Sequence, residues 1–266
     1  MLVVLLSVLV FMSLVMAVAW AYVRHTGNGG WTDVFWTFGT GLAGVATALA
    51  PGSDPATSPY RQLLVAVLVA LWSLRLGTYI FTRVSRGAED ARYVQLKKEW
   101  GGFGAKAFGF LQIQAPATTL LCSAIFLAAA KPDAGLSPFD FAGLAILCVA
   151  ILGEGIADHQ MKAFKADAGN HGKVMDRGLW SWSRHPNYFF EWLGWLAYPV
   201  IALAPGGAPY PLGWLSLLGP AFMFWLLTRV TGVPPLEQAM IASKGDAYRA
   251  YQRRVSAFFP LPPRSD

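Results

Sequence analysis

Seven long apolar runs constrain this chain more than any other feature of its sequence. They cover residues 2–23, 33–50, 61–82, 108–130, 138–157, 188–204 and 212–231. A transmembrane helix needs about 20 mostly apolar residues, and each run is close to that length. The sequence therefore predicts an all-α integral membrane protein, built as a bundle of seven transmembrane helices.

The composition agrees with a membrane setting. Hydrophobic residues make up 55% of the chain and charged residues 14%, and the mean hydropathy is +0.43. Soluble domains carry about 25% charged residues, so a large soluble core is excluded. No Lys or Arg precedes the first run, which we interpret as a retained span rather than a signal peptide. Cys122 and Cys148 lie in apolar stretches and predict no disulfide framework.

The connecting segments alternate in charge, and this alternation predicts the orientation. Segments 24–32, 83–107, 158–187 and 229–266 contain 18 of the 21 Lys and Arg residues, whereas segments 51–60, 131–137 and 205–211 contain only Lys131. By the positive-inside rule the basic segments are cytoplasmic, with the N-terminus outside and the C-terminus inside. The external connections are short and rich in Pro and Gly, so we expect function on the cytoplasmic side.

Two groups of polar residues are candidates for a binding cleft. Glu154, Asp158, Lys162 and Lys165 are spaced to form one stripe on a helix that continues out of the fifth span. This stripe is either a solvated set of ion pairs or one wall of a cofactor cleft. The second group interleaves cations with aromatic rings, which suits phosphates and a flat base but is also common at membrane interfaces. Its members are Lys173, Arg177, Trp180, Trp182, Arg184 and His185.

The sixth span carries an amide and a carboxylate near its start. Pro186 suits the first turn of a helix, so we expect the helix to begin near Asn187 and its N-terminal dipole to face the same cleft. Asn187 and Glu191 are four residues apart and share a helix face. They either form a hydrogen-bonded packing pair or line a functional site. Acids at membrane depth are functional candidates by default, which favours the second interpretation.

Five motifs carry a resemblance to a known family. They are NGGWTDVFW at 28–36, LWSLRLGTY at 71–79, RGAEDARY at 86–93, DRGLW followed by SRHPNYFFEW at 176–192, and GDAYRAYQRRVSAFFP at 245–260. The RHPNY block resembles the signature of the steroid 5α-reductase C-terminal superfamily. The DVFW and EDARY elements point to a bacterial membrane branch of it, of the domain of unknown function 1295 type. The resemblance covers almost the whole chain.

The resemblance implies seven transmembrane helices that hold NADPH in a cleft open to the cytosol, with a substrate that enters from the lipid. Asp158 then matches an acid on the cofactor-binding helix, Lys162 and Lys165 match arginines there, and Asn187 and Glu191 match residues that line the nicotinamide end. A looser match assigns Tyr248, Arg249 and Arg253 to a segment that closes over the cofactor. The predicted cofactor-binding residues are Asp158, Lys162, Lys165, Lys173, Arg177, Trp182, Arg184, His185, Asn187, Tyr188, Tyr248, Arg249 and Arg253.

The substrate side departs from the family pattern. The reductases polarise the substrate carbonyl with a Tyr on the third span and a Glu on the second. Here Trp72 occupies the corresponding region of the third span, and an indole N–H is a poor acid. Asp33 stands near the Glu position, and Tyr79 or Tyr93 could supply the missing acid. The predicted catalytic residues are therefore Glu191, Asp33 and Tyr79.

The sequence thus predicts an NADPH-dependent reductase of a lipophilic enone or related activated alkene, located in a bacterial inner membrane. We expect one domain over 1–266, with residues 1–107 on the substrate side and 108–266 on the cofactor side. The protein should be a monomer that contacts membrane lipids, without a nucleic-acid partner. His159 and His171 lack ligand-spaced partners, so no metal site is expected. Two alternatives remain open: an S-adenosylmethionine-dependent membrane methyltransferase, and a non-enzymatic sterol- or lipid-binding protein.

Overall fold

The computed structural model describes residues 1–50, 56–87, 89–133, 135–205 and 209–264, and this part of the chain contains helices and no strands. The helices group into two compact units. Unit 1 comprises Met1–Leu144 and Ala197–Gly219, and unit 2 comprises Ala145–Leu196 and Pro220–Asp266. Each unit is described by itself below.

Five stretches of helix are long and apolar enough to cross a membrane, which supports a membrane protein. Among the described residues they are Leu2–Thr26, Pro59–Ser85, Ala105–Ala129, Pro138–Ala166 and Pro211–Lys244. Five of the seven predicted spans fall within them. The runs at 33–50 and 188–204 are also helical, but α2 is the shorter helix Trp31–Ala48 and the other run is interrupted.

The interruption lies in the predicted sixth span. Helix α8 (Pro186–Trp195) is followed after Leu196 by α9 (Ala197–Ala202). Pro199 has no N–H to donate to the carbonyl four residues earlier, so the regular α ladder breaks here. Between the two helices, the amide of Leu196 donates to the carbonyl of Leu193, three residues earlier, at 3.1 Å.

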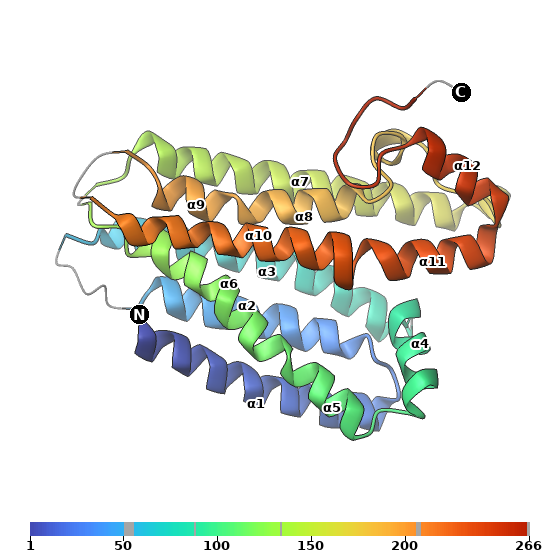
Figure 1. The fold of residues 1–266 in the computed structure, drawn as a ribbon, viewed down its shortest axis with the longest axis horizontal. Helices are drawn as coiled ribbons and strands as arrows, with labels where there is room; N and C mark the ends of the chain where they lie inside the picture. The colour runs from blue at the N-terminus through green and yellow to red at the C-terminus, as the bar shows by residue number, and fades with distance from the viewer. Residues whose placement is uncertain (51–55, 88, 134, 206–208, 265–266) are drawn as a thin grey trace. The chain divides into compact units, whose positions relative to one another are not determined.

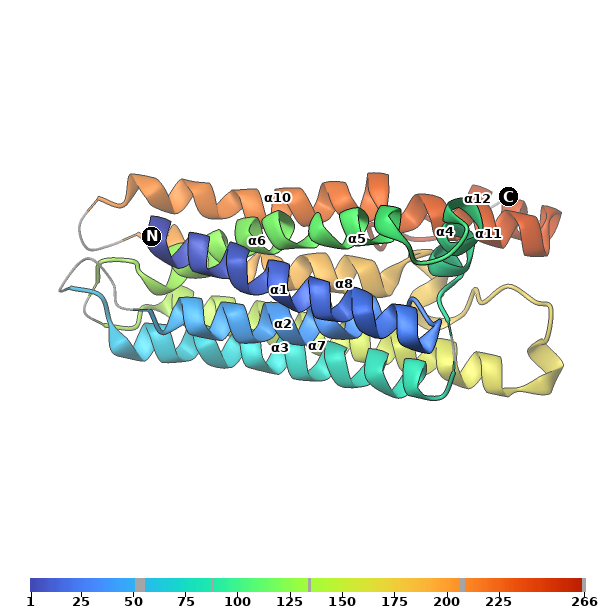
Figure 2. The ribbon, with the colours of Figure 1, turned by 90° about the horizontal axis from the view of Figure 1, so that it is seen from below.

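Unit 1 is built on α1 (Leu2–Thr26), α2 and α3 (Pro59–Ser85), with α5 (Ala105–Gln112) and α6 (Gln114–Ala129) packed against α1. Figures 1 and 2 show α1, α2 and α3 running side by side. A Cβ on Gly41 of α2 would lie 2.0 Å from Ser73 Oγ, so only glycine permits this approach to α3. The α1 residues Met12, Met16 and Ala19 are fully buried.

The short helix α4 (Ala91–Trp100) closes one end of unit 1, where the chain turns from α1 into α2 (Figure 1). Lys97 Nζ donates to the Gly27 carbonyl at 2.8 Å, and the Gly29 amide donates to Glu89 Oε1 at 2.7 Å. These bonds tie α4 and the segment that precedes it to the connection between α1 and α2.

A buried ion pair tethers the other end of unit 1. Arg61 in the first turn of α3 is fully buried, and its Nε donates to Asp140 Oδ1 at 2.8 Å. Its guanidinium also donates to the carbonyls of Lys131, Asp133 and Gly135. Because each of these contacts is with the protein itself, Arg61 serves as a structural tether of the connection between α6 and α7 (Pro138–Ala166).

Unit 2 contains most of α7 (Pro138–Ala166), α8, α11 (Val233–Lys244) and α12 (Asp246–Arg254), with the 3-10 turns η1 (Ala168–Asn170) and η2 (Gly178–Ser181) between α7 and α8. In the last span, η3 (Pro211–Leu217) belongs to unit 1, α10 (Leu218–Trp225) crosses the unit boundary, and the π-helical turn η4 (Leu226–Val230) leads into α11. Helix α12 follows α11 after a sharp turn at Gly245, near the end of the chain (Figure 1). Phe190 of α8 packs so closely on α7 that a Cβ on Gly153 would lie 2.4 Å from its ring.

Candidate functional site

The residues that precede α8 lie against the C-terminal tail of unit 2, which we define as residues 255–264. The Ser183 hydroxyl donates to the Phe258 carbonyl at 2.8 Å, and the Arg184 amide donates to the Ser256 carbonyl at 2.8 Å. The Ser183 hydroxyl also accepts the His185 amide at 3.1 Å. Two segments far apart in sequence therefore form one wall, and α8 begins at Pro186 as its proline predicted.

Glu237 on α11 accepts hydrogen bonds from residues of this wall and of α12. Its Oε1 accepts from Arg184 Nε at 2.7 Å and from His185 Nε2 at 3.2 Å, and its Oε2 accepts from Gln252 Nε2 at 2.7 Å. The side chains of Arg184 and Glu237 are only 10% and 14% exposed. Arg184 Nη1 also donates to the carbonyls of Gln252 and Val255. We call this set of contacts the Glu237 hub; it joins the start of α8, α11 and α12.

Tyr248, one of the predicted cofactor residues, belongs to the hub. It is buried, and its hydroxyl donates to Glu237 Oε1 at 3.5 Å. Burial, reinforced by the Glu237 carboxylate, raises the pKa of the Tyr248 phenol well above its ordinary value. The hydroxyl therefore stays protonated at neutral pH and acts as a donor toward the protein.

A basic pocket of about 270 Å³ opens on the same wall. Four arginines line it, together with Gln252 and residues of the tail, and none of the described lining residues is acidic. The arginines are Arg184, Arg253, Arg254 and Arg264. Guanidinium groups bind phosphate through paired hydrogen bonds, so the charge and chemistry of this pocket suit a phosphorylated ligand.

The structure separates the two predicted C-terminal arginines. Arg253 lines the basic pocket, whereas Arg249 forms an exposed pair with Asp246 at 3.5 Å. Arg254, which also lines the pocket, pairs with Asp176 at 3.3 Å, and this pair ties α12 to the loop before α8. The other predicted cations of unit 2 are exposed on its surface: Lys162, Lys165, Lys173 and Arg177.

The charged stripe on α7 is divided by burial. Helix α7 continues to Ala166, as the stripe predicted, and Glu154 and Asp158 are buried while Lys162 and Lys165 are exposed. The aromatic members of the neighbouring cluster also differ. Trp180 is buried and donates from Nε1 to the Ala157 carbonyl at 3.0 Å, whereas Trp182 is 47% exposed. Only Trp182 therefore offers an open face for stacking on a ligand.

On α8, the predicted amide and acid share one helix face. Glu191 is buried and accepts a hydrogen bond from Trp195 Nε1 at 3.0 Å, and Asn187 is half-buried one turn earlier. The Tyr188 ring stacks on the His185 imidazole, with centroids 5.6 Å apart and planes 7° from parallel. This stacking fixes the imidazole plane beside the Glu237 hub.

In unit 1 the structure brings Asp33 and Tyr93 together. The Tyr93 hydroxyl donates to Asp33 Oδ1 at 2.6 Å, and Arg92 Nη2 donates to Asp33 Oδ2 at 3.2 Å. Burial, followed by the Asp33 carboxylate, raises the pKa of the Tyr93 phenol well above its ordinary value. Tyr79 lies on α3 with its ring centroid 5.7 Å from the Arg75 guanidinium carbon. Of the two tyrosines considered from the sequence, Tyr93 is thus the one that bonds to Asp33.

Sequence reasoning missed several residues that build the wall and its pocket. They are Asp176, Glu237, Gln252, Arg254 and Arg264. The only available signal for Glu237 was an acid placed just after the last apolar run, in a segment that is otherwise mostly basic. In the described part of the chain no three His, Cys, Asp or Glu residues are grouped closely enough to hold a metal ion.

Comparison with known proteins places the chain in a family. Residues 19–255 match the family described as protein of unknown function (DUF1295). A Schizosaccharomyces pombe protein, described as uncharacterized protein C594.04c, is 29% identical to this chain over 228 residues. The match covers 75% of this chain and 63% of the yeast protein, so the chain spans less than two thirds of that relative. No solved structure matches the chain. Because the family match covers most of its length, the chain belongs to the DUF1295 family.

Proposed function

We propose that this protein is an NADPH-dependent membrane reductase acting on a lipophilic enone or a related activated alkene. The observation that carries the proposal is the basic pocket of unit 2, where four arginines gather without an acidic lining residue among those described. Arg184 and Arg254 already pair with Glu237 and Asp176, so the exposed Arg253 and Arg264 are the lining groups that we expect to bind an anionic ligand. Arginine binds phosphates through paired hydrogen bonds. S-adenosylmethionine carries no phosphate, so the pocket favours a reductase over a methyltransferase.

The residues present fit the phosphate-bearing part of NADPH. The pocket volume of about 270 Å³ lies just below the range of about 300–1,000 Å³ that is usual for whole small-molecule sites, so it suits phosphates rather than an entire dinucleotide. Arg253 and Arg264 are exposed lining residues that can turn toward such a group. Arg184 already bonds to Glu237 and to two carbonyls, so in our proposal it orients the pocket wall.

The remaining predicted residues have roles that follow from their positions. Exposed Lys173, Arg177 and Trp182 would bind the outer part of the cofactor, and Asn187 and Glu191 its nicotinamide end. When bound, NADPH supplies the hydride for such a reduction. Tyr93 holds a proton at Oη, and Arg92 presents N–H groups beside it. We assign Arg92, oriented by Asp33, to hydrogen bonding with the substrate carbonyl oxygen, which stabilises developing negative charge there. The Tyr93 hydroxyl donates its one proton to Asp33 and holds that carboxylate in place.

We propose the same membrane location and orientation that the sequence predicts. All seven apolar runs would cross a bacterial inner membrane, with the N-terminus outside and the basic segments, including the cofactor pocket, on the cytoplasmic side. Residues 1–107 would serve the substrate and residues 108–266 the cofactor, within a monomer surrounded by membrane lipids.

Ligand binding to the purified protein tests the proposal, with Arg253→Gln and Arg249→Gln as matched variants. We expect NADPH to bind wild type, and Arg253→Gln to weaken binding by roughly tenfold to a hundredfold, since a hydrogen bond to a charged group contributes about 1.5–3 kcal/mol. Arg249→Gln, which removes an exposed charge outside the pocket, should change the affinity little. Binding of S-adenosylmethionine instead of NADPH would overturn the proposal in favour of a methyltransferase. Absence of binding by either cofactor would favour a lipid-binding protein.

A further inference from the structure

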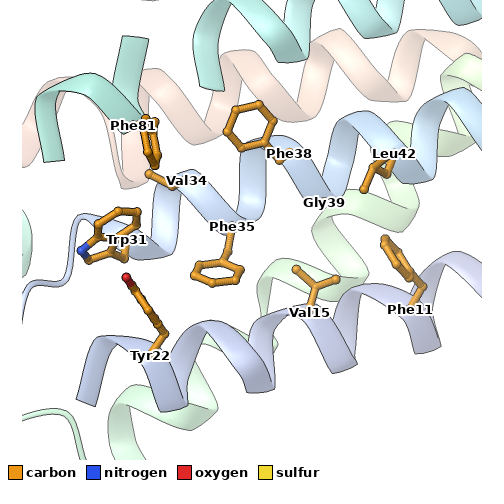
Figure 3. A pocket seen from close by; sticks show the side chains of 10 residues that line it. All are labelled: Phe11, Val15, Tyr22, Trp31, Val34, Phe35, Phe38, Gly39, Leu42 and Phe81. Atoms are coloured by element: carbon orange, nitrogen blue, oxygen red, sulfur yellow. The ribbon is translucent and has the colours of Figure 1, made fainter. Parts of the chain in front are cut away.

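An apolar groove runs along the outer surface of unit 1 and has no role in the proposed reaction. Figure 3 shows its walls: α1 contributes Phe11, Val15 and Tyr22, α2 contributes a stripe from Trp31 to Leu42, and α3 contributes Phe81. Its volume is about 530 Å³, within the usual range of small-molecule sites. Phe81 and Leu42 are 46% and 66% exposed, so the groove is open at the surface of the helices.

The groove has one polar end and one apolar end. Side-chain polar atoms occur only on Tyr22 and Trp31 among its ten lining residues, and in Figure 3 the Tyr22 hydroxyl points toward the Trp31 ring. The two rings are 5.1 Å apart at their centroids, in an edge-on arrangement. Phe11 and Leu42 lie at the opposite end (Figure 3). A ligand with a polar head and a hydrocarbon tail matches this polarity.

The length of the groove fits one leaflet of a bilayer. Phe11 and Tyr22 are 11 residues apart on α1, which corresponds to about 16 Å of helix. The hydrocarbon core of a bilayer is about 30 Å thick, so one leaflet accounts for about 15 Å. Helices α1 and α3 are both long and apolar enough to cross a membrane, which places their outer faces against lipid chains.

Positive charge lies just beyond the polar end. His25 is three residues after Tyr22 and so extends the groove-facing stripe of α1, and Arg24 is its neighbour in the last turn; both are exposed. Basic residues at this depth attract anionic phospholipid headgroups. We propose that the groove is a binding site for an anionic phospholipid, with an acyl chain between α1 and α2 and its phosphate near Tyr22, Trp31 and His25.

Quenching by brominated lipids tests this site directly. The protein is reconstituted in nanodiscs of zwitterionic phospholipid with a small fraction of anionic phospholipid brominated on its acyl chain. The chain has 11 tryptophans, so the Trp31 signal is taken as the difference between wild type and Trp31→Phe. The difference between wild type and Trp214→Phe reports a 66% exposed tryptophan outside the groove. We expect Trp31 to be quenched at a lower fraction of brominated anionic lipid than Trp214; equal quenching overturns the proposal.

Filling the groove provides the second test. Val15→Phe should abolish the preferential quenching of Trp31, whereas Val10→Phe, which adds the same group to an exposed α1 position outside the groove, should not. If Val15→Phe does not fold, Leu42→Phe fills the exposed side of the same groove. Retention of preferential quenching in a folded groove-filling variant overturns the site.

The headgroup assignment is tested by exchanging the brominated lipid. Brominated zwitterionic lipid should quench Trp31 less than the anionic lipid does. The double variant Arg24→Gln/His25→Gln should lower the anionic preference on the order of fivefold, the effect of removing about one cation near the bilayer surface. Equal quenching by both lipids in wild type overturns the anionic assignment. Trp31 quenching that falls as protein concentration rises would instead identify a second copy of the chain as the occupant.

Discussion

Replacement of Glu237 by alanine is the perturbation that most directly tests the architecture of unit 2. Glu237 accepts hydrogen bonds from Arg184, His185, Gln252 and Tyr248, and so it holds the start of α8 and helix α12 together. The variant removes every one of these acceptors while leaving the apolar packing of α11 largely unchanged. It also leaves the Arg184 guanidinium, which is 10% exposed, without its carboxylate.

The expected loss of stability follows from the burial of the Arg184–Glu237 ion pair. Removing one partner of a buried ion pair costs about 3–5 kcal/mol, because the remaining charge is left uncompensated. Arg184 retains its bonds to the carbonyls of Gln252 and Val255, so we expect the lower end of this range. A loss of about 3 kcal/mol raises the local opening equilibrium of α12 roughly a hundredfold. Glu237→Gln keeps one acceptor oxygen and should cost about 1 kcal/mol, or roughly fivefold.

Amide hydrogen exchange followed by mass spectrometry measures this opening in detergent-solubilised protein. Peptides that cover α12 and residues 255–264 should exchange faster in Glu237→Ala, while the interior of α7 exchanges at its wild-type rate. Gln238→Ala changes the exposed neighbour of Glu237 and serves as the control. Unchanged exchange of α12 in Glu237→Ala would refute the structural role of the hub. Arg184→Ala should resemble Glu237→Ala, so loss of activity in that variant does not report on cofactor contact alone.

Two further predictions concern unit 1. A Cβ on Gly29 would lie 2.5 Å from Tyr93 Cβ, so Gly29→Ala should displace Tyr93 and lower the thermal unfolding midpoint by several degrees. Gly109→Ala is the control, because a Cβ there meets nothing within 4 Å and should not lower the midpoint. Equal midpoints for the two variants would contradict this close packing. Burial alone would raise the pKa of the Asp90 carboxyl, but Arg92 and Arg83 lower it below its ordinary value. The stabilisation from Asp90 is therefore fully present above the unfolded-state pKa and is lost as the pH falls through the lower folded-state pKa. Asp90→Asn should be less stable than wild type at neutral pH, with a stability gap that narrows as the pH falls below about 4. A gap independent of pH in denaturation curves would argue against this assignment.

Local sequence pattern was sufficient for the long apolar helices and for the conclusion that this is a membrane protein. Apolar runs of span length predict helices because a backbone surrounded by lipid chains must form its hydrogen bonds within the segment itself. The charged stripe predicted that α7 continues beyond the fifth run, and it does. Pro186 predicted the start of α8 for an equally local reason, its fixed backbone angle. Pro199 shows the limit of such rules. The hydropathy of residues 188–204 predicted one continuous span, whereas the helix is interrupted before Pro199.

What each polar side chain contacts was decided only by the tertiary structure. Arg184 and His185 looked like ligand-binding residues in the sequence, yet they bond to Glu237, more than 50 residues away. Arg249 and Arg253 are one helical turn apart and looked equivalent, but only Arg253 lines the basic pocket. Asp33 and Tyr93 meet across 60 residues. Composition and periodicity indicate which segments form apolar helices, because that depends on the local sequence. They cannot fix long-range polar pairing, because that depends on which helix ends the fold brings within hydrogen-bonding distance.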